Sequence, residues 1–126
     1  MKPPPPPGPP DVKDLRELVD QWAAFVTDLE RQDYSFDLDN WLNDVDVRQL
    51  VAEALPMFSR EEMGDHALKL DDADGLFMAA TRDFKRCVWS SGTAKREKWT
   101  AQKNWWYFRT PQRTNAQLED ELATVR

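Results

Sequence analysis

Residues able to do acid–base, nucleophilic or metal chemistry are few in this sequence of 126 residues. It contains one histidine, His66, and one cysteine, Cys87. A structural zinc site needs about four such ligands, so no metal is expected. His66 as a general base would need an orienting acid and a nucleophile, and the adjacent Asp65 would point elsewhere on a helix. Cys87 lies in an apolar helical pattern, which predicts a small buried hydrophobic residue.

The acidic run D71-D-A-D-G75 is superficially similar to a calcium loop. Aligning Gly75 with the loop glycine puts Leu70 and Thr81 where the first and last carboxylates belong, so the match fails. A solvated turn or a helix N-terminus explains these acids better. Phosphate-cradling glycine loops, nucleophile-elbow motifs and dinucleotide motifs do not occur. We therefore expect no cofactor and no enzymatic activity.

The most distinctive stretch is K98-W-T-A-Q-K-N-W-W-Y-F-R109, which combines aromatic and basic residues. The β preference of aromatic residues favours an extended form. In that form Trp105 and Tyr107 face one way, while Trp106 and Phe108 face the other. Each ring buries roughly 150–250 Å² when it is packed, so both sides need a cover. That cover could be more of this chain, a second copy or a partner.

Three interpretations of this stretch remain open. It could wrap around the helices and close the core from both sides. It could dock a protein partner, since aromatic residues and arginine are enriched at interface hot spots. It could also bind single-stranded nucleic acid through residues 95–113, with cations on phosphates and rings stacked on bases. We favour protein docking as the function, with these predicted partner-binding residues: Lys98, Trp99, Lys103, Trp105, Trp106, Tyr107 and Arg109.

Charge is distributed unevenly around this stretch. Residues 1–81 carry 7 basic and 18 acidic side chains, whereas residues 82–113 carry 9 basic and 2 acidic ones. The acidic part would repel a polyanion, which weakens the nucleic-acid interpretation. It would also attract the basic segment back onto the acidic helices of the same chain. An acidic protein partner or a second copy of this chain meets less repulsion than nucleic acid does.

Three apolar patterns predict the helices that must position these residues. Asp11 caps a helix near 11–31, whose stripe consists of Val12, Leu15, Leu18, Val19, Trp22, Phe25, Val26 and Leu29. Part of this stripe fits a coiled-coil seam that would permit a homodimer, but it covers barely three heptads. Residues 34–55 change face midway, which predicts two short helices, 37–44 and 46–55, with Asp44 or Asp46 as the new N-cap.

A third helix is predicted from the capping box Ser59-Arg-Glu-Glu62 to about residue 88, bent near Gly64 or residues 71–75. Its stripe is Leu70, Ala73, Leu76, Phe77, Ala80, Phe84, Cys87 and Val88. Residues 90–93 form a predicted loop. Thr114 or Asn115 is predicted to cap a last short helix with Leu118, Leu122 and Val125 on one side.

Residues 3–10 are five prolines, a glycine and two more prolines. Such a tract favours a polyproline II conformation, as a stiff extension or as a ligand for an aromatic-lined groove.

We predict a mainly α fold in a compact domain of three to five helices, with an extended aromatic C-terminal segment packed across it. Its parts are a proline-rich arm (1–10) and one helical domain (11–126), made of an acidic helical body (11–88), a basic aromatic segment (89–113) and a C-terminal helix (114–126).

Cysteine usage and apolar runs set the remaining expectations. One cysteine cannot build a disulfide framework, and the N-terminus lacks the apolar region of a secretory signal. No apolar run approaches the eighteen or so residues that span a bilayer, so no membrane partner is expected. We expect a cytoplasmic, non-enzymatic protein-binding module or accessory factor.

Overall fold

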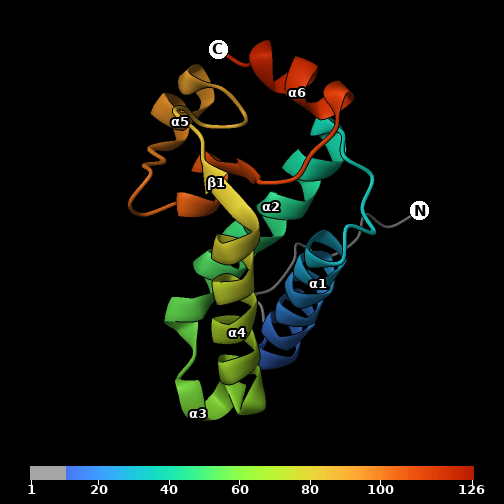
Figure 1. Cartoon of the computed structure of the whole chain (residues 1–126). Coiled ribbons are helices and arrows are strands. Elements are labelled where there is room, and N and C mark those ends of the chain that lie inside the picture. The colour runs from blue at the N-terminus through green and yellow to red at the C-terminus, as the bar shows by residue number, and fades with distance from the viewer. Residues whose placement is uncertain (1–10) are drawn as a thin grey trace, which may run out of the picture.

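The computed structural model describes residues 11–126, so the predicted arm of residues 1–10 lies outside the described residues. The described chain is 67% helical with six α-helices and one small two-stranded sheet, which confirms the predicted mainly α class. Three long helices form the lower body, and the C-terminal elements gather over the other end (Figure 1). Among residues 11–126, none of the helices combines the length and the apolar character needed to cross a bilayer.

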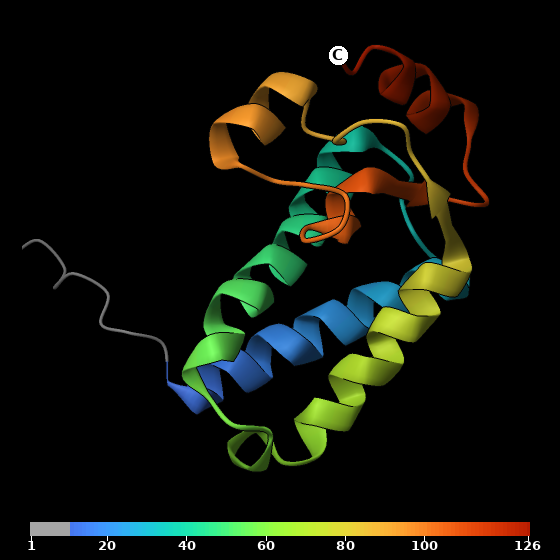
Figure 2. The ribbon, with the colours of Figure 1, turned by 90° about the vertical axis from the view of Figure 1, so that its left-hand side faces the viewer.

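Helix α1 spans Val12–Glu30 and begins at a capping box, in which the Asp11 side chain accepts from the Asp14 backbone N–H and the reverse bond also forms. The predicted stripe is buried for most of its length, at Leu15, Val19, Trp22, Phe25, Val26 and Leu29. The helix crosses between α2 and α4 and contacts both (Figure 2). Its apolar face is therefore covered within one chain.

Helix α2 is continuous over Leu38–Ala54, so the predicted break near residues 43–46 is wrong. One face includes Trp41, whose ring lies 5.6 Å from Phe25 and 5.9 Å from Phe77. The opposite face is buried too, at Val47, Val51 and Ala54, and the C-terminal part of the chain also contacts the helix. A straight helix with two apolar faces is stable here because layers cover it on both sides.

The two residues predicted as alternative caps of a second helix have tertiary partners instead. Asp44 accepts a hydrogen bond from the Tyr34 hydroxyl at 2.7 Å. Asp46 accepts one from the Tyr107 hydroxyl, also at 2.7 Å. Both carboxylates therefore bind the rings packed beside α2 and do not start a new helix.

The predicted single helix 60–88 is instead two helices, α3 and α4, followed by a strand and a loop. After the turn η1 (Leu55–Met57), the short helix α3 (Arg60–Met63) uses the predicted capping box at Ser59. Gly64 then takes φ 62° and separates α3 from α4 (Asp65–Ala80). Leu70, Ala73 and Phe77 are buried as predicted, but Leu76 is exposed.

Helix α4 ends at Ala80, earlier than predicted, because its C-terminal carbonyls have partners from far along the chain. Strand β1 (Thr81–Asp83) follows at once and pairs antiparallel with β2 (Arg109–Pro111), with Thr81 opposite Pro111. The Thr81 hydroxyl donates to the Phe77 carbonyl at 2.7 Å. Phe84, Cys87 and Val88 pack from the following loop, so the helical spacing of these residues does not reflect a helix.

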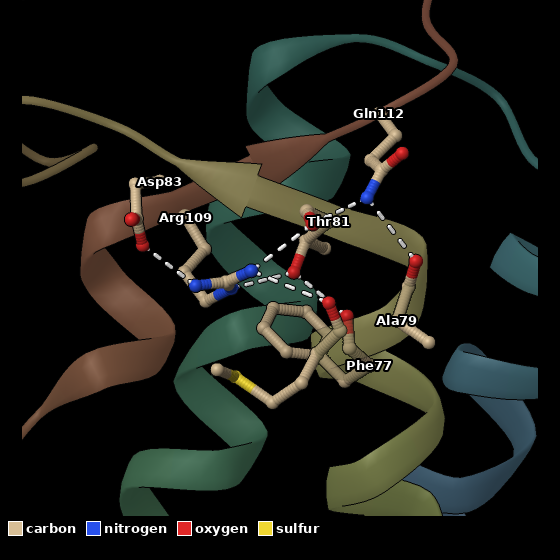
Figure 3. A network of polar contacts seen from close by, with 7 residues as sticks. Phe77, Ala79, Thr81, Asp83, Arg109 and Gln112 are labelled. Carbon is tan, nitrogen blue, oxygen red and sulfur yellow. Dashed lines mark hydrogen bonds and ion pairs between the residues drawn. The ribbon is translucent and has the colours of Figure 1, made fainter.

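The guanidinium of Arg109 closes this helix end (Figure 3). It donates to the Thr81 hydroxyl at 2.7 Å, to the Thr81 carbonyl at 3.0 Å and to Asp83 at 2.7 Å. Gln112 adds bonds to the carbonyls of Ala79 and Thr81. A cation at a helix C-terminus also interacts favourably with the helix dipole.

The aromatic segment is not extended at its centre. The predicted loop of residues 90–93 is wrong, because Ser90 caps helix α5 (Ser91–Glu97). The turn η2 (Trp105–Phe108) is a 3₁₀ helix that leads into β2. A 3₁₀ turn has three residues per turn, so consecutive rings point in different directions. Helix α6 (Ala116–Ala123) is capped by Asn115, as predicted, and buries Leu118 and Leu122.

Candidate protein-docking groove

A groove lies between α2 and α5, apolar in its first part and more polar in its second. Its first part is an open hollow of about 480 Å³ and is lined by Asp46, Gln49, Leu50, Trp89, Thr93, Glu97, Trp99 and Tyr107. A second hollow of about 380 Å³ shares Gln49, Glu97 and Trp99 and adds Ala52, Glu53, Pro56, Lys98, Lys103, Asn104 and Trp106. Because the two hollows share three lining residues, we call them together the α2–α5 groove.

Two large apolar side chains of the groove face solvent. Leu50 is 48% exposed and Trp89 is 38% exposed. Leu50 shares the spacing of Val47 and Val51 on the second apolar face of α2, but it is exposed because α5 leaves this part of the helix uncovered. Exposed apolar groups that meet in one concave surface are typical of binding sites.

Hydrogen bonds and stacking fix the rings of the groove. The ring of Trp99 stacks on Tyr107, with centroids 4.0 Å apart and planes 18° apart. The Tyr107 hydroxyl and the Trp89 indole N–H both donate to Oδ1 of Asp46, at 2.7 and 2.9 Å. Burial first, and then the bond to Asp46, raise the pKa of Tyr107 above its ordinary value. The phenol therefore stays a neutral donor.

A buried amide holds the loop at the second hollow. Asn104 donates from Nδ2 to Oε1 of Gln49 at 3.0 Å, and its Oδ1 accepts from the Thr100 backbone N–H at 3.1 Å. These bonds tie the loop after α5 to α2. The groove walls are thus connected by directional contacts as well as by packing.

The structure brings five of the seven predicted partner-binding residues to the groove: Lys98, Trp99, Lys103, Trp106 and Tyr107. Trp99 and Tyr107 form part of its wall, although Tyr107 is only 1% exposed. Lys98 and Lys103 are exposed and line the second hollow. Lys98 ends α5 in the left-handed conformation, with φ 60°.

Trp105, Trp106 and Arg109 have roles inside the chain, although Trp106 also lines the second hollow. Trp106 is 2% exposed. Trp105 packs against Phe77, with ring centroids 5.8 Å apart. Arg109 is bound to the end of α4. In this conformation Trp106 and Arg109 stabilise the monomer and present little surface to a partner.

Sequence reasoning missed Asp46, Leu50 and Trp89 as groove residues. Trp89 had a usable signal, because it follows Val88 at the start of the basic segment and lies beyond the apolar stripe. Leu50 had none, since its spacing from Val47 and Val51 indicates a buried face.

In the described part of the chain, the basic segment packs against the acidic helices without direct ion pairs to them. Among residues 11–126, no salt bridge joins a cation of residues 85–108 to an acid of residues 11–81. The segment is held to α2 by ring packing and by hydrogen bonds such as Tyr107–Asp46. The opposite charges of the basic segment and of residues 11–81 therefore do not form direct ion pairs.

Other hollows and polar clusters are weaker candidates for a functional site. A hollow of about 520 Å³ lies between β1 and α6, but its charges are partly paired, with Arg82 bound to Glu119 and Asp83 bound to Arg109. His66 is 2.9 Å from Asp20, which also accepts from Lys69, and all three lie outside the α2–α5 groove. Within the described part of the chain, no three His, Cys, Asp or Glu side chains are grouped so as to hold a metal ion.

Neither a protein-family model nor a curated protein nor a solved structure matches this chain.

Proposed function

We propose that this chain is a small, non-enzymatic protein-binding module whose contact surface is the α2–α5 groove. The observation that carries the proposal is the exposure of Leu50 and Trp89 on one groove with fixed aromatic walls. A partner segment that buries these side chains would gain roughly 25 cal/mol for each Å² of apolar surface removed from water. Rigid rings add to the affinity because little conformational entropy is lost when they bind.

The single-stranded nucleic-acid alternative has less support. Of its stacking residues, Trp106 and Tyr107 are buried and Trp105 packs on Phe77. Carboxylates of Asp46, Glu53 and Glu97 also line the groove beside the lysines. A phosphate backbone would meet repulsion there.

Affinity capture with matched leucine variants tests the proposal. Leu50→Glu places a charge in the groove, whereas Leu68→Glu makes the same change at a residue on α4 that is 63% exposed and outside the groove. We expect Leu50→Glu to weaken capture of a partner protein at least about tenfold, because an unpaired charge replaces an apolar contact. Leu68→Glu should capture as well as the natural chain.

Circular dichroism of both variants serves as the folding control, and titration of the captured partner with salt separates the two functions. Nucleic-acid binding weakens steeply with salt, whereas an apolar protein interface does not. Equal capture by the two glutamate variants would show that the groove is not the contact surface.

A further inference from the structure

The proline-rich arm is the one sequence motif that the proposed function leaves unused. Residues 3–10 contain seven prolines and one glycine, and they precede the first residue that the structure describes. Proline fixes its own φ, so such a tract favours polyproline II, whose backbone makes no internal hydrogen bonds. Its ring faces and free carbonyl groups are what aromatic-lined grooves recognise.

The α2–α5 groove has the chemistry that such a ligand requires. Trp89, Trp99 and Leu50 supply flat or apolar surface for proline rings, and the two indoles are held by Asp46 and Tyr107. Hydrogen bonds within residues 11–126 engage the indole N–H of Trp22, Trp41 and Trp89, but none engages that of Trp99. The Trp99 N–H is therefore available to a backbone carbonyl of the ligand.

Charge favours the same pairing. Lys2 directly precedes the prolines. Of the residues that the structure describes, the carboxylates of Asp46 and Glu97 and no cation line the first part of the groove, whereas Lys98 and Lys103 line the second part. A cation at one end of the proline tract would meet opposite charge in the first part of the groove. Such rim contacts set the orientation of a ligand more than its affinity.

The described chain starts at the end of the molecule that the groove reaches, and the arm is long enough to follow the groove along α2. The start of α1 and the end of α2 lie at the same end of the molecule (Figures 1 and 2). The second hollow reaches Pro56, just past that end of α2. The nine residues 2–10 would span about 28 Å as polyproline II. The 17 residues of α2 span only about 26 Å.

We propose that the proline-rich arm, residues 2–10, binds in the α2–α5 groove of its own chain, with proline rings packed on Trp89, Trp99 and Leu50. This inference rests on the proposed function, because the arm and the partner protein use the same groove. The arm is then an intramolecular competitor, and a partner must displace it. A proline-rich segment is accordingly the ligand class that the groove accepts.

The experiment uses the full chain in two forms, the natural sequence and a variant in which the seven prolines of residues 3–10 are replaced by serine. An acetylated peptide of residues 2–11 is titrated into each form, and the indole N–H signals of Trp89 and Trp99 are followed by NMR, with assignment by single Trp→Phe variants. The peptide should move both signals of the serine variant saturably. The natural chain should need at least about fivefold more peptide, because a tethered competitor reaches an effective concentration near the millimolar range.

Matched variants locate the peptide. In the serine variant, Leu50→Glu should abolish the shifts and Leu68→Glu should leave them unchanged, since both leucines are exposed on helices and only Leu50 lines the groove. Absence of saturable shifts at Trp89 and Trp99 overturns the proposal. Equal peptide affinity in the two forms also overturns it, because the arm then leaves the groove open.

Dilution separates one chain from two. If the natural chain's Trp89 and Trp99 signals move toward those of the serine variant on a roughly 25-fold dilution, the arm comes from a second copy, and the intramolecular proposal is wrong. Partner capture that depends on Leu50 without any peptide binding would remove the arm from the groove and leave the proposed function standing. Peptide binding in the groove, combined with partner capture that does not depend on Leu50, would support the arm in the groove and contradict the proposed function.

Discussion

The buried guanidinium of Arg48 is paired through two hydrogen bonds with Asp74, from Nε to Oδ1 at 2.9 Å and from Nη2 to Oδ2 at 3.0 Å. The indole N–H of Trp22 donates to the same carboxylate at 2.9 Å. The guanidinium also lies over the ring of Trp106, 4.8 Å from its centroid. One carboxylate on α4 thus connects α1 and α2, and Arg48 extends the connection to the aromatic turn.

Asp74→Ala should therefore destabilise the protein strongly. It leaves the buried Arg48 cation without a counter-charge and removes the acceptor of Trp22. Losing one partner of a buried pair costs about 3–5 kcal/mol of unfolding free energy. Urea unfolding would measure it, with Asp72→Ala, an exposed neighbour on the same helix, as the control expected within about 0.5 kcal/mol of the natural chain. Similar losses in both variants would contradict the structural role of Asp74.

Two glycines should respond to alanine with opposite signs. Gly64 joins α3 to α4 with φ 62° and ψ −135°, a conformation that an L side chain rarely adopts, so Gly64→Ala should cost about 1–3 kcal/mol. Gly75 lies inside α4 with open space around an added Cβ, so Gly75→Ala should stabilise by about 1 kcal/mol. Thermal unfolding compares them directly. Stabilisation by Gly64→Ala would mean that the junction is not held as described.

The alkaline limit of stability should depend on two tyrosines. Burial, followed by the hydrogen bonds to Asp44 and Asp46, raises the pKa of Tyr34 and Tyr107 above the ordinary value of 10.0. The folded chain then holds its phenolic protons more tightly than the unfolded chain does. Their stabilising contribution is complete below the unfolded pKa and is lost as the pH rises above it.

Ultraviolet absorbance of phenolate measures this effect cleanly, because the sequence contains only these two tyrosines. We expect phenolate to appear together with the loss of helical circular dichroism, at a pH above 10. Tyr34→Phe and Tyr107→Phe should each make the alkaline fall in stability less steep. Phenolate that forms near pH 10 in a fully helical chain would show that the rings are open to solvent.

The sequence predicted the local features of the fold well. The stripe and cap of α1, the capping box at Ser59 and the cap at Asn115 all depend on residues within a few positions of one another. The change of face within α2 was also recognised. Its consequence was misjudged because the cover of the second face includes residues some fifty positions later, which no local pattern reveals.

Long-range contacts explain the other differences. The apolar period of α4 continues to Val88, but Arg109 and Gln112 bind the carbonyls at its end, and Thr81 leaves the helix for the sheet. For the candidate site, the sequence pointed to the aromatic segment, which supplies Trp99 and Tyr107 to the groove. Which of its rings would be exposed depends on how the 3₁₀ turn orients them, and spacing alone does not determine this.

Two tryptophans of the basic aromatic segment, Trp89 and Trp106, should differ in how much they contribute to stability. Trp106 is buried beside Arg48, so Trp106→Ala should lower the unfolding free energy by about 3–5 kcal/mol through the cavity that it leaves. Trp89 is partly exposed and makes one hydrogen bond, to Asp46, so Trp89→Ala should cost only about 1 kcal/mol. Urea unfolding of both variants gives the comparison. A large loss at Trp89 would mean that its ring supports the fold, and groove variants at that position would then report on stability as well as on binding.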